Sequence, residues 1–126
     1  DLFNPTWLQA QLQAVACSIS PQDVQATLTA FTAHSCADAV LRYGRGSHSL
    51  LVCGGGALNA ELMRQLQALL PQAKVESTTA RGLPPLQVEA TAFAWLARQC
   101  MHGLPGNLAV VTGAQGPRIL GAIYPA

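Results

Sequence analysis

The spacing of apolar residues along the chain predicts helices that alternate with short strands. The predicted helices cover residues 7–16, 21–43, 57–70 and 85–101, each with apolar side chains recurring at helical intervals. The second has the clearest start, because Ser20 can cap it, Pro21 suits its first position and Asp23 can reach back to the cap. Gly44 or Gly46 should end it, which makes it long for a small domain.

Two short segments read as strands between these helices. Residues 49–53 are almost continuously apolar, as in a parallel strand buried on both faces, and residues 73–76 form the second strand. Residues 108–112 and 119–124 also read as extended. This alternation predicts an α/β fold whose parallel strands are joined by right-handed crossovers and packed by long helices. Two clear strands are few for so much helix, so we expect a sheet that lacks some of its strands.

Composition narrows the possible classes of protein. The 126 residues suit one compact domain, and half of them are apolar while only 10% are charged. This low charge indicates that another part of a larger protein covers some of the surface. The net charge is +1 with scattered cations, which argues against nucleic-acid binding, and no apolar run approaches the roughly 20 residues that span a bilayer.

The chain has no starting Met and no basic-then-apolar leader, so we expect an excised piece of a cytoplasmic protein. Four cysteines lie in apolar segments without CxxC spacing and are expected to be buried, reduced thiols: Cys17, Cys36, Cys53 and Cys100. Three histidines fall on different elements without metal-like spacing, and no metal site is expected from them: His34, His48 and His102.

The strongest chemical signal is the triplet Gly54-Gly55-Gly56 between a strand and a helix. Glycines let a ligand approach the backbone, and the helix N-terminus offers unpaired N–H groups to a phosphate or nucleoside. A Walker phosphate loop is excluded, since Gly-Lys-Ser and Gly-Lys-Thr are absent. A purely structural turn remains an alternative.

Two nucleotide ligands compete for this turn. Gly54-x-Gly56-x-x-Asn59 half-matches the dinucleotide fingerprint, and Glu76 ends the next strand where a ribose-binding acid would lie. Against a dinucleotide, the sixth position is Asn and the triplet follows a long helix instead of opening the fold. The other ligand is the adenosine part of ATP.

Polar residues near the end of the second strand and on the last helix are further candidates. Glu89 is an isolated acid in an apolar helix, where a buried carboxylate would need a partner or a ligand. It can equally be an acid that packs between helices. Thr78, Thr79 and Arg81 follow a strand end, where α/β proteins bind ligands, although the loop can simply turn the chain.

Six blocks in order give the whole chain a specific resemblance. They are Leu2-Phe3-Asn4 with Trp7-Leu8, residues 23–30, residues 52–59, residues 88–97, Pro105-Gly106-Asn107-Leu108 with Val111-Thr112-Gly113-Ala114, and residues 119–123. With them the chain resembles the C-terminal part of the anhydro-N-acetylmuramic acid kinases, which belong to the actin/hexokinase/Hsp70-type ATPase superfamily. The resemblance implies a truncated ribonuclease H-like fold, with residues 1–126 as a single nucleotide-side subdomain lacking the N-terminal domain and the first strands of its sheet.

The resemblance also implies a function. Gly54, Gly55, Gly56 and Asn59 would hold adenosine, and Glu89 would bind the sugar. The whole enzyme would use ATP and Mg²⁺ to open the 1,6-anhydro bond of anhydro-N-acetylmuramic acid and phosphorylate O6 during peptidoglycan recycling, as an expected homodimer. The catalytic aspartate and both phosphate loops would lie upstream, so the fragment alone is expected to be inactive. Ala109-Val110 depart from the family's proline and serine. A non-catalytic association module remains the alternative.

Overall fold

The computed structural model describes residues 3–15 and 17–124. The chain divides into two compact units, one made of residues up to 48 together with 60–74, the other of residues 49–59 together with those from 75 onward. In chain order the elements are α1 (Pro5–Ala14), α2 (Pro21–Tyr43), β1 (Ser49–Val52), the 3₁₀ helix η1 (Gly55–Leu58), α3 (Ala60–Leu69), β2 (Lys74–Ser77), the 3₁₀ helices η2 (Thr78–Arg81) and η3 (Pro85–Gln87), α4 (Val88–Met101) and α5 (Ala109–Thr112).

Helix α2 begins and ends where the sequence predicts. The Ser20 hydroxyl oxygen accepts a 3.1 Å hydrogen bond from the Asp23 N–H, and the hydroxyl donates to the Asp23 carboxylate at 2.7 Å. Pro21 occupies the first turn, where no N–H is needed. At the other end the Gly44 N–H donates to the Val40 carbonyl at 2.8 Å. The predicted capping signal therefore sets the start of the helix.

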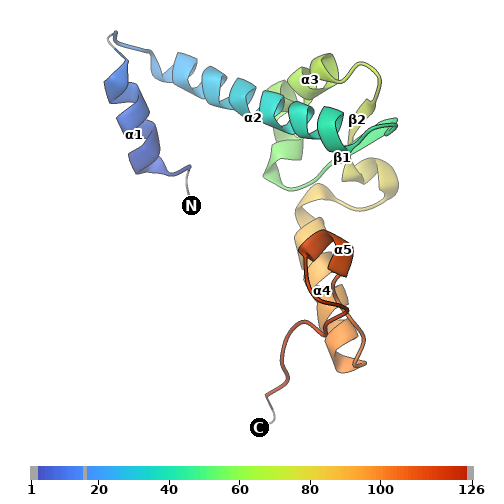
Figure 1. Cartoon of the computed structure of the whole chain (residues 1–126). Coiled ribbons are helices and arrows are strands. Elements are labelled where there is room, and N and C mark those ends of the chain that lie inside the picture. The colour runs from blue at the N-terminus through green and yellow to red at the C-terminus, as the bar shows by residue number, and fades with distance from the viewer. Residues whose placement is uncertain (1–2, 16, 125–126) are drawn as a thin grey trace. The chain divides into compact units, whose positions relative to one another are not determined.

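The core of the first unit lies between α2 and α3, which run side by side in Figure 1. Among the described residues, the buried apolar side chains are Ala33 and Ala37 on α2, Leu62 and Leu66 on α3, and Leu70 and Ala73 after it. Because the two alanines have small side chains, the leucines of α3 can pack closely against the backbone of α2. Leu58, which we expected on the same stripe, lies before the helix in η1 and is exposed.

Helix α1 starts two residues earlier than predicted because Asn4 caps it. The Asn4 side-chain oxygen accepts a 2.9 Å hydrogen bond from the Trp7 N–H. The Phe3 ring meets the rings of Trp7 and Phe31 edge to face, with centroids 5.0 and 5.6 Å away. These aromatic contacts join the start of α1 to α2. The predicted end at Ala16 lies outside the described residues.

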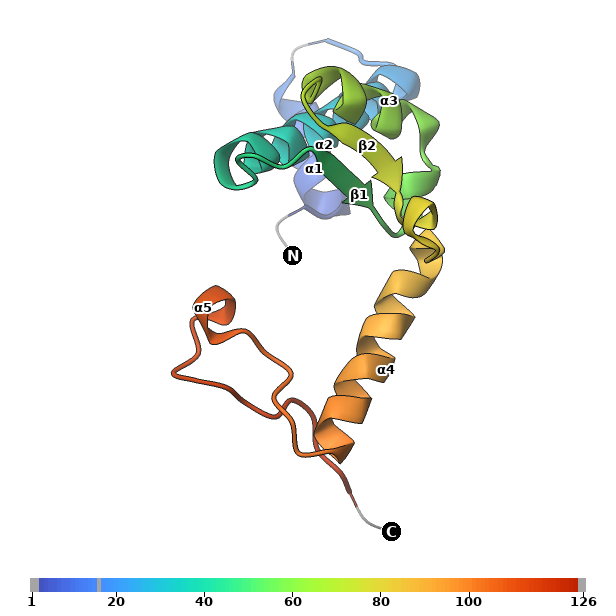
Figure 2. The same cartoon turned by 90° about the vertical axis from the view of Figure 1, so that its right-hand side faces the viewer.

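The second unit contains β1 and β2, which pair in a two-stranded sheet and run parallel in Figure 2. The α/β class and the two strands are therefore confirmed. Both carboxyl ends lie at one edge, followed by the Gly54 turn after β1 and by η2 after β2. This is the edge at which α/β proteins place ligands.

The first of the two predicted extended segments after α4 is corrected. Residues 108–112, which include the β-branched Val110 and Val111, were predicted to be extended, but α5 forms there. Gly113, at φ 71°, ends this turn and donates its N–H to the Ala109 carbonyl at 3.0 Å. Residues 119–124 contain no helix and pair with no strand within the described chain, so the predicted extended tail has no sheet partner there.

The burial predicted for the cysteines is also wrong. All four thiols are free, and only Cys100 is even half-buried. Cys36 precedes the buried Ala37 by one position and therefore lies on another face of α2. Helix α4 likewise has no buried residue, although it is rich in apolar side chains such as Phe93 and Trp95. In the part of the chain that the structure describes, no helix has the length and apolarity needed to cross a membrane.

Candidate functional site

The glycine turn begins with a backbone conformation that requires glycine. Gly54 has φ 71° and ψ −167°, in a region that only glycine adopts without strain. Its N–H donates to the Pro85 carbonyl at 2.9 Å, and its own carbonyl accepts from the Ala57 N–H at 3.2 Å. The turn is thereby fixed between the end of β1 and the residues that precede α4.

The rest of the triplet opens η1 and leaves room for a ligand. A Cβ atom added at Gly55 would meet no atom within 4 Å, so this backbone faces open space. Gly56 accepts a 3.1 Å hydrogen bond from the Asn59 N–H, which closes the 3₁₀ turn ahead of α3. The 3₁₀ helix η1 lies between β1 and α3. The connection that contains the triplet is therefore longer than a strand-to-helix turn needs to be.

A cavity of about 410 Å³ brings the glycine turn and the start of α4 together. Its lining consists of Cys53, Gly54, Gly55, Pro85, Leu86, Val88, Glu89 and Ala92. Two of the predicted nucleotide residues and the predicted sugar residue therefore face one space. The other two predicted residues, Gly56 and Asn59, do not line it. Apolar groups make up most of the wall, and Glu89 supplies its one charged side chain.

Glu89 lies in the first turn of α4 and is exposed, so the prediction that it is buried is wrong. Sequence reasoning took its apolar neighbours as a sign of burial, but none of the α4 residues is buried within this chain. The Glu89 carboxylate is open to solvent at the wall of the cavity. It can accept hydrogen bonds from hydroxyl or amide groups of a ligand in the cavity.

The apolar lining was not predicted from the sequence. Pro85, Leu86 and Val88 belong to the turn that follows β2, and the Gly54–Pro85 hydrogen bond draws this turn to the end of β1. The order of the strands could have predicted this contact, because the loops that follow two adjacent parallel strands emerge at the same edge of the sheet. Cys53 was singled out as a buried thiol, yet it lies at the cavity.

The loop after β2 is built by local hydrogen bonds. The Ser77 hydroxyl accepts from the Thr79 N–H at 3.3 Å, and the Thr78 carbonyl accepts from the Leu83 N–H at 3.3 Å. Gly82, at φ 79°, ends η2. Thr78, Thr79 and Arg81 do not line the cavity, although the structure gives the enclosed Thr78 hydroxyl oxygen no hydrogen-bond partner. These contacts account for a loop that turns the chain.

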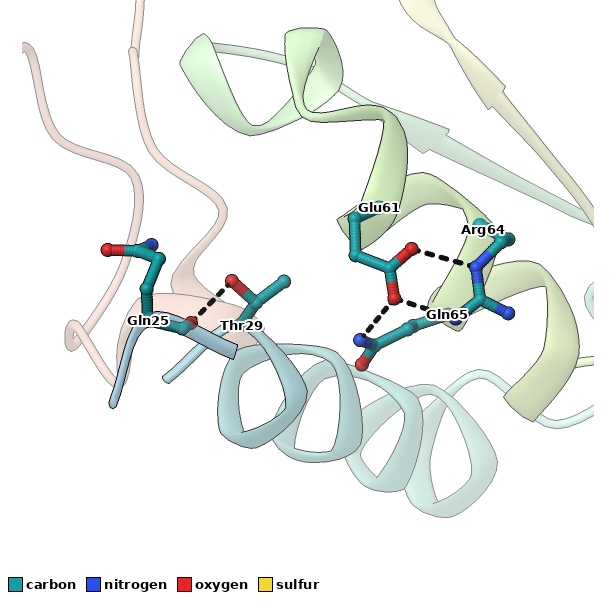
Figure 3. Close-up of polar contacts among 5 residues, drawn as sticks. All are labelled: Gln25, Thr29, Glu61, Arg64 and Gln65. Carbon is teal, nitrogen blue, oxygen red and sulfur yellow. Dashed lines mark hydrogen bonds and ion pairs between the residues drawn. The ribbon is translucent and has the colours of Figure 1, made fainter. Parts of the chain in front are cut away.

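The marked pKa shifts belong to α3 rather than to the cavity. The Arg64 guanidinium and the Gln65 amide both donate hydrogen bonds to the Glu61 carboxylate (Figure 3). These bonds, of which the one from Arg64 has the larger effect, lower the pKa of Glu61 to about 2. The same pairing raises the pKa of Arg64. Among the described residues, no group of three His, Cys, Asp or Glu side chains could hold a metal ion. The cavity therefore offers a carboxylate and backbone groups, and we assign it no metal ligand.

Comparison with known proteins places the chain in a family. The family model for anhydro-N-acetylmuramic acid kinase matches residues 1–126. Proteins of that name are 64% identical in Variovorax paradoxus, 61% in Albidiferax ferrireducens and 56% in Ralstonia nicotianae, each over the full 126 residues. The chain spans only about a third of their length, at 33%, 32% and 33%. By its match over every residue, the chain belongs to the anhydro-N-acetylmuramic acid kinase family.

Proposed function

We propose that this chain is the nucleotide-side part of a kinase that opens the 1,6-anhydro bond of anhydro-N-acetylmuramic acid with water and phosphorylates O6 from ATP. The product would be N-acetylmuramic acid 6-phosphate, formed during recycling of peptidoglycan in the bacterial cytoplasm. Membership of the family and the names of the relatives support this reaction. We also propose that the whole enzyme has the actin-type ATPase fold, of which this chain supplies part.

The cavity shared by the glycine turn and Glu89 is the observation that carries the proposal. A kinase must hold both of its substrates in one site, and its catalysis consists largely of positioning them. A backbone without side chains at Gly54 and Gly55 would allow the nucleotide to approach from one wall. Glu89, on the opposite element, would hold the sugar.

We assign each residue a role that matches its chemistry. Gly54, Gly55 and Gly56 would present backbone to the adenosine part of ATP, and Asn59 would add an amide next to them. The Glu89 carboxylate would accept hydrogen bonds from the sugar and so orient it. The base that activates water would come from outside residues 1–126, because the cavity contains Glu89 as its sole carboxylate.

ATP would bring Mg²⁺, which neutralises charge on the phosphates. The described residues contain no cluster that fits the ion, so no step of the reaction is assigned to a metal ligand of this segment. The isolated chain should therefore bind part of ATP without catalysing transfer. We further propose that the whole enzyme is a homodimer.

A full-length chimera tests the function. In it, residues 1–126 replace the matching third of the Variovorax paradoxus relative, to which they are 64% identical. With ATP, Mg²⁺ and anhydro-N-acetylmuramic acid, the chimera should release ADP and one sugar 6-phosphate per ADP, identified by mass spectrometry. The isolated chain should form none. A chimera that folds but transfers no phosphate would contradict the proposal, and thermal protection by NAD but not by ATP would favour a dinucleotide site.

A further inference from the structure

The segment from Gly106 to Arg118 closes on itself after α4. The Gly106 N–H donates to the Arg118 carbonyl at 2.9 Å. The Arg118 N–H donates back to the Asn107 side-chain oxygen at 2.6 Å. The Asn107 side-chain amide also donates to the Gly116 carbonyl at 3.2 Å. Figure 2 shows this loop leaving α4, carrying α5 and returning. Its ends are therefore joined as in a compact Ω-loop, a type of loop that is frequently functional.

The tip of this loop also has a fixed shape. The Leu108 carbonyl accepts hydrogen bonds from the Val111 and Thr112 N–H groups at 2.9 and 3.0 Å, and from the Thr112 hydroxyl at 3.1 Å. Gly113 then ends the turn in the left-handed conformation. Local hydrogen bonds thus specify the tip without any covering element.

The base of the loop is attached to α4. The Gln99 carbonyl accepts a 2.9 Å hydrogen bond from the Leu104 N–H, and the Gln99 amide donates to the Pro105 carbonyl at 3.1 Å. Gly106 packs so closely that an added Cβ would lie 2.9 Å from Leu96 Cδ2. A loop with a fixed base and a fixed tip loses little conformational entropy when it binds a partner surface.

The tip presents apolar side chains to solvent. Leu108 is 70% exposed, Val110 95% and Val111 78%. Each side chain therefore lacks the stabilisation that its burial away from water would supply. A preformed loop with three exposed apolar side chains is typical of an interaction surface. None of its residues belongs to the proposed nucleotide or sugar site.

We propose that residues 106–118 form a docking loop, and that the tip residues Leu108, Val110 and Val111 are covered by the two thirds of the same kinase chain that relatives possess beyond this segment. The chain spans only 33% of such a relative, so the covering mass exists within one protein. Large apolar side chains are also exposed on α1, α2 and α4. A second copy would bury one self-matching patch of about 800 Å² per partner, too small to cover faces on so many elements.

Cysteine labelling in the full-length chimera tests this contact directly. Val110→Cys introduces a thiol at the most exposed tip position, and Gln115→Cys is the matched control, because Gln115 is an exposed polar residue of the same loop. Labelling is followed at each site by peptide mass spectrometry in native and in denatured protein. Native Val110→Cys should react at least about tenfold more slowly than native Gln115→Cys. Equal rates would overturn the proposal.

A charged substitution separates the rest of the chain from a second copy. Val110→Asp should lower the Tm of the chimera by about 2–4 °C while its oligomeric mass by light scattering stays unchanged, because a charge would be placed in an internal contact. Gln115→Asp should leave both unchanged. A loss of oligomeric mass with Val110→Asp at unchanged Tm would assign the tip to a second copy and overturn the proposal. If Val110→Asp does not fold, the milder Val110→Ser takes its place in the same two measurements.

Discussion

The backbone N–H of Gly54 donates a 2.9 Å hydrogen bond to the carbonyl oxygen of Pro85. This bond links the turn after β1 to the residues that start α4, four positions before Glu89. The two walls of the candidate cavity are therefore held together by backbone rather than by side chains. A change that distorts the Gly54 backbone should disturb both the proposed nucleotide side and the proposed sugar side of the site.

The two glycines that line the cavity should respond differently to alanine. Gly54→Ala forces a side chain into a backbone region used by glycine, at a cost of about 1–3 kcal/mol, and should lower the Tm of the chimera and its kcat/KM. Gly55→Ala meets no atom within 4 Å and should leave the Tm unchanged. Its methyl group would enter the nucleotide space and raise KM for ATP. Equal KM values for ATP in Gly55→Ala and wild type would remove Gly55 from the nucleotide site.

Replacing the cavity's carboxylate should affect the sugar and not the fold. Because Glu89 is exposed, Glu89→Gln should leave the Tm unchanged while raising KM or lowering kcat for anhydro-N-acetylmuramic acid, by about tenfold for the loss of a charge-assisted hydrogen bond. Steady-state kinetics with saturating ATP measures both constants. Glu61→Gln is the matched control, since Glu61 lies on α3 and does not line the cavity. Unchanged sugar kinetics in Glu89→Gln would exclude the ligand role.

Cys53 provides a probe of occupancy that requires no substitution. Its exposed thiol lines the cavity beside Gly54, so ATP or sugar bound there should slow its alkylation. Cys36 lies on α2 and should react at the same rate with and without ligand. Site-resolved mass spectrometry gives the two rates in one sample. If both ligands leave the rate at Cys53 unchanged, they bind elsewhere.

Leucine truncations should separate the core from the surface. Leu66 is 2% exposed between α2 and α3, and Leu66→Ala should destabilise its unit by about 2–5 kcal/mol, because a cavity remains where its side chain was. Leu58 lies eight positions earlier on the same predicted stripe and is 66% exposed. Within this chain, Leu58→Ala should therefore lower the free energy of unfolding far less than Leu66→Ala. Urea denaturation of both variants measures the difference. Similar losses would contradict the exposed position of Leu58.

The elements predicted correctly from the sequence are those with local signals. Ser20, Pro21 and Gly44 specify both ends of α2 by capping and backbone preference, which act within one helical turn. Val110 and Val111 misled the prediction, because their β-preference is overridden by hydrogen bonds that depend on Asn107 and Gly113.

Burial and site membership could be predicted only in part, because they depend on neighbours distant in sequence. Glu89 was predicted to be buried from its apolar flanks, yet no residue of α4 is buried within the described chain. Its position beside Gly54 and Gly55 follows from the pairing of β1 with β2 and from the Pro85 contact, neither of which has a local signature. The turn at Gly54 was predictable, because its positive φ requires glycine.

The pairing of Glu61 with Arg64 predicts a pH dependence of stability. The guanidinium Nε and Nη2 atoms donate to the Glu61 carboxylate at 2.8 and 2.6 Å and lower its pKa from 4.5 to about 2 (Figure 3). A lowered folded-state pKa stabilises the protein above the unfolded pKa, and this stabilisation is lost as pH falls from about 4.5 toward 2. The pair is fully exposed, so the contribution should be small and weakened by salt.

Arg64→Leu should therefore lower the Tm slightly at pH 6, and the difference from wild type should shrink steadily as the pH is lowered from 5 to the acid limit of folding. Scanning calorimetry at low ionic strength, repeated in about 1 M salt, measures this difference. Arg45→Leu removes another exposed arginine of the same unit and should show no such trend, since no ion pair of Arg45 is seen in the described chain. A Tm difference for Arg64→Leu that stays constant down to the acid limit would mean that the carboxylate of Glu61 titrates alike in folded and unfolded protein.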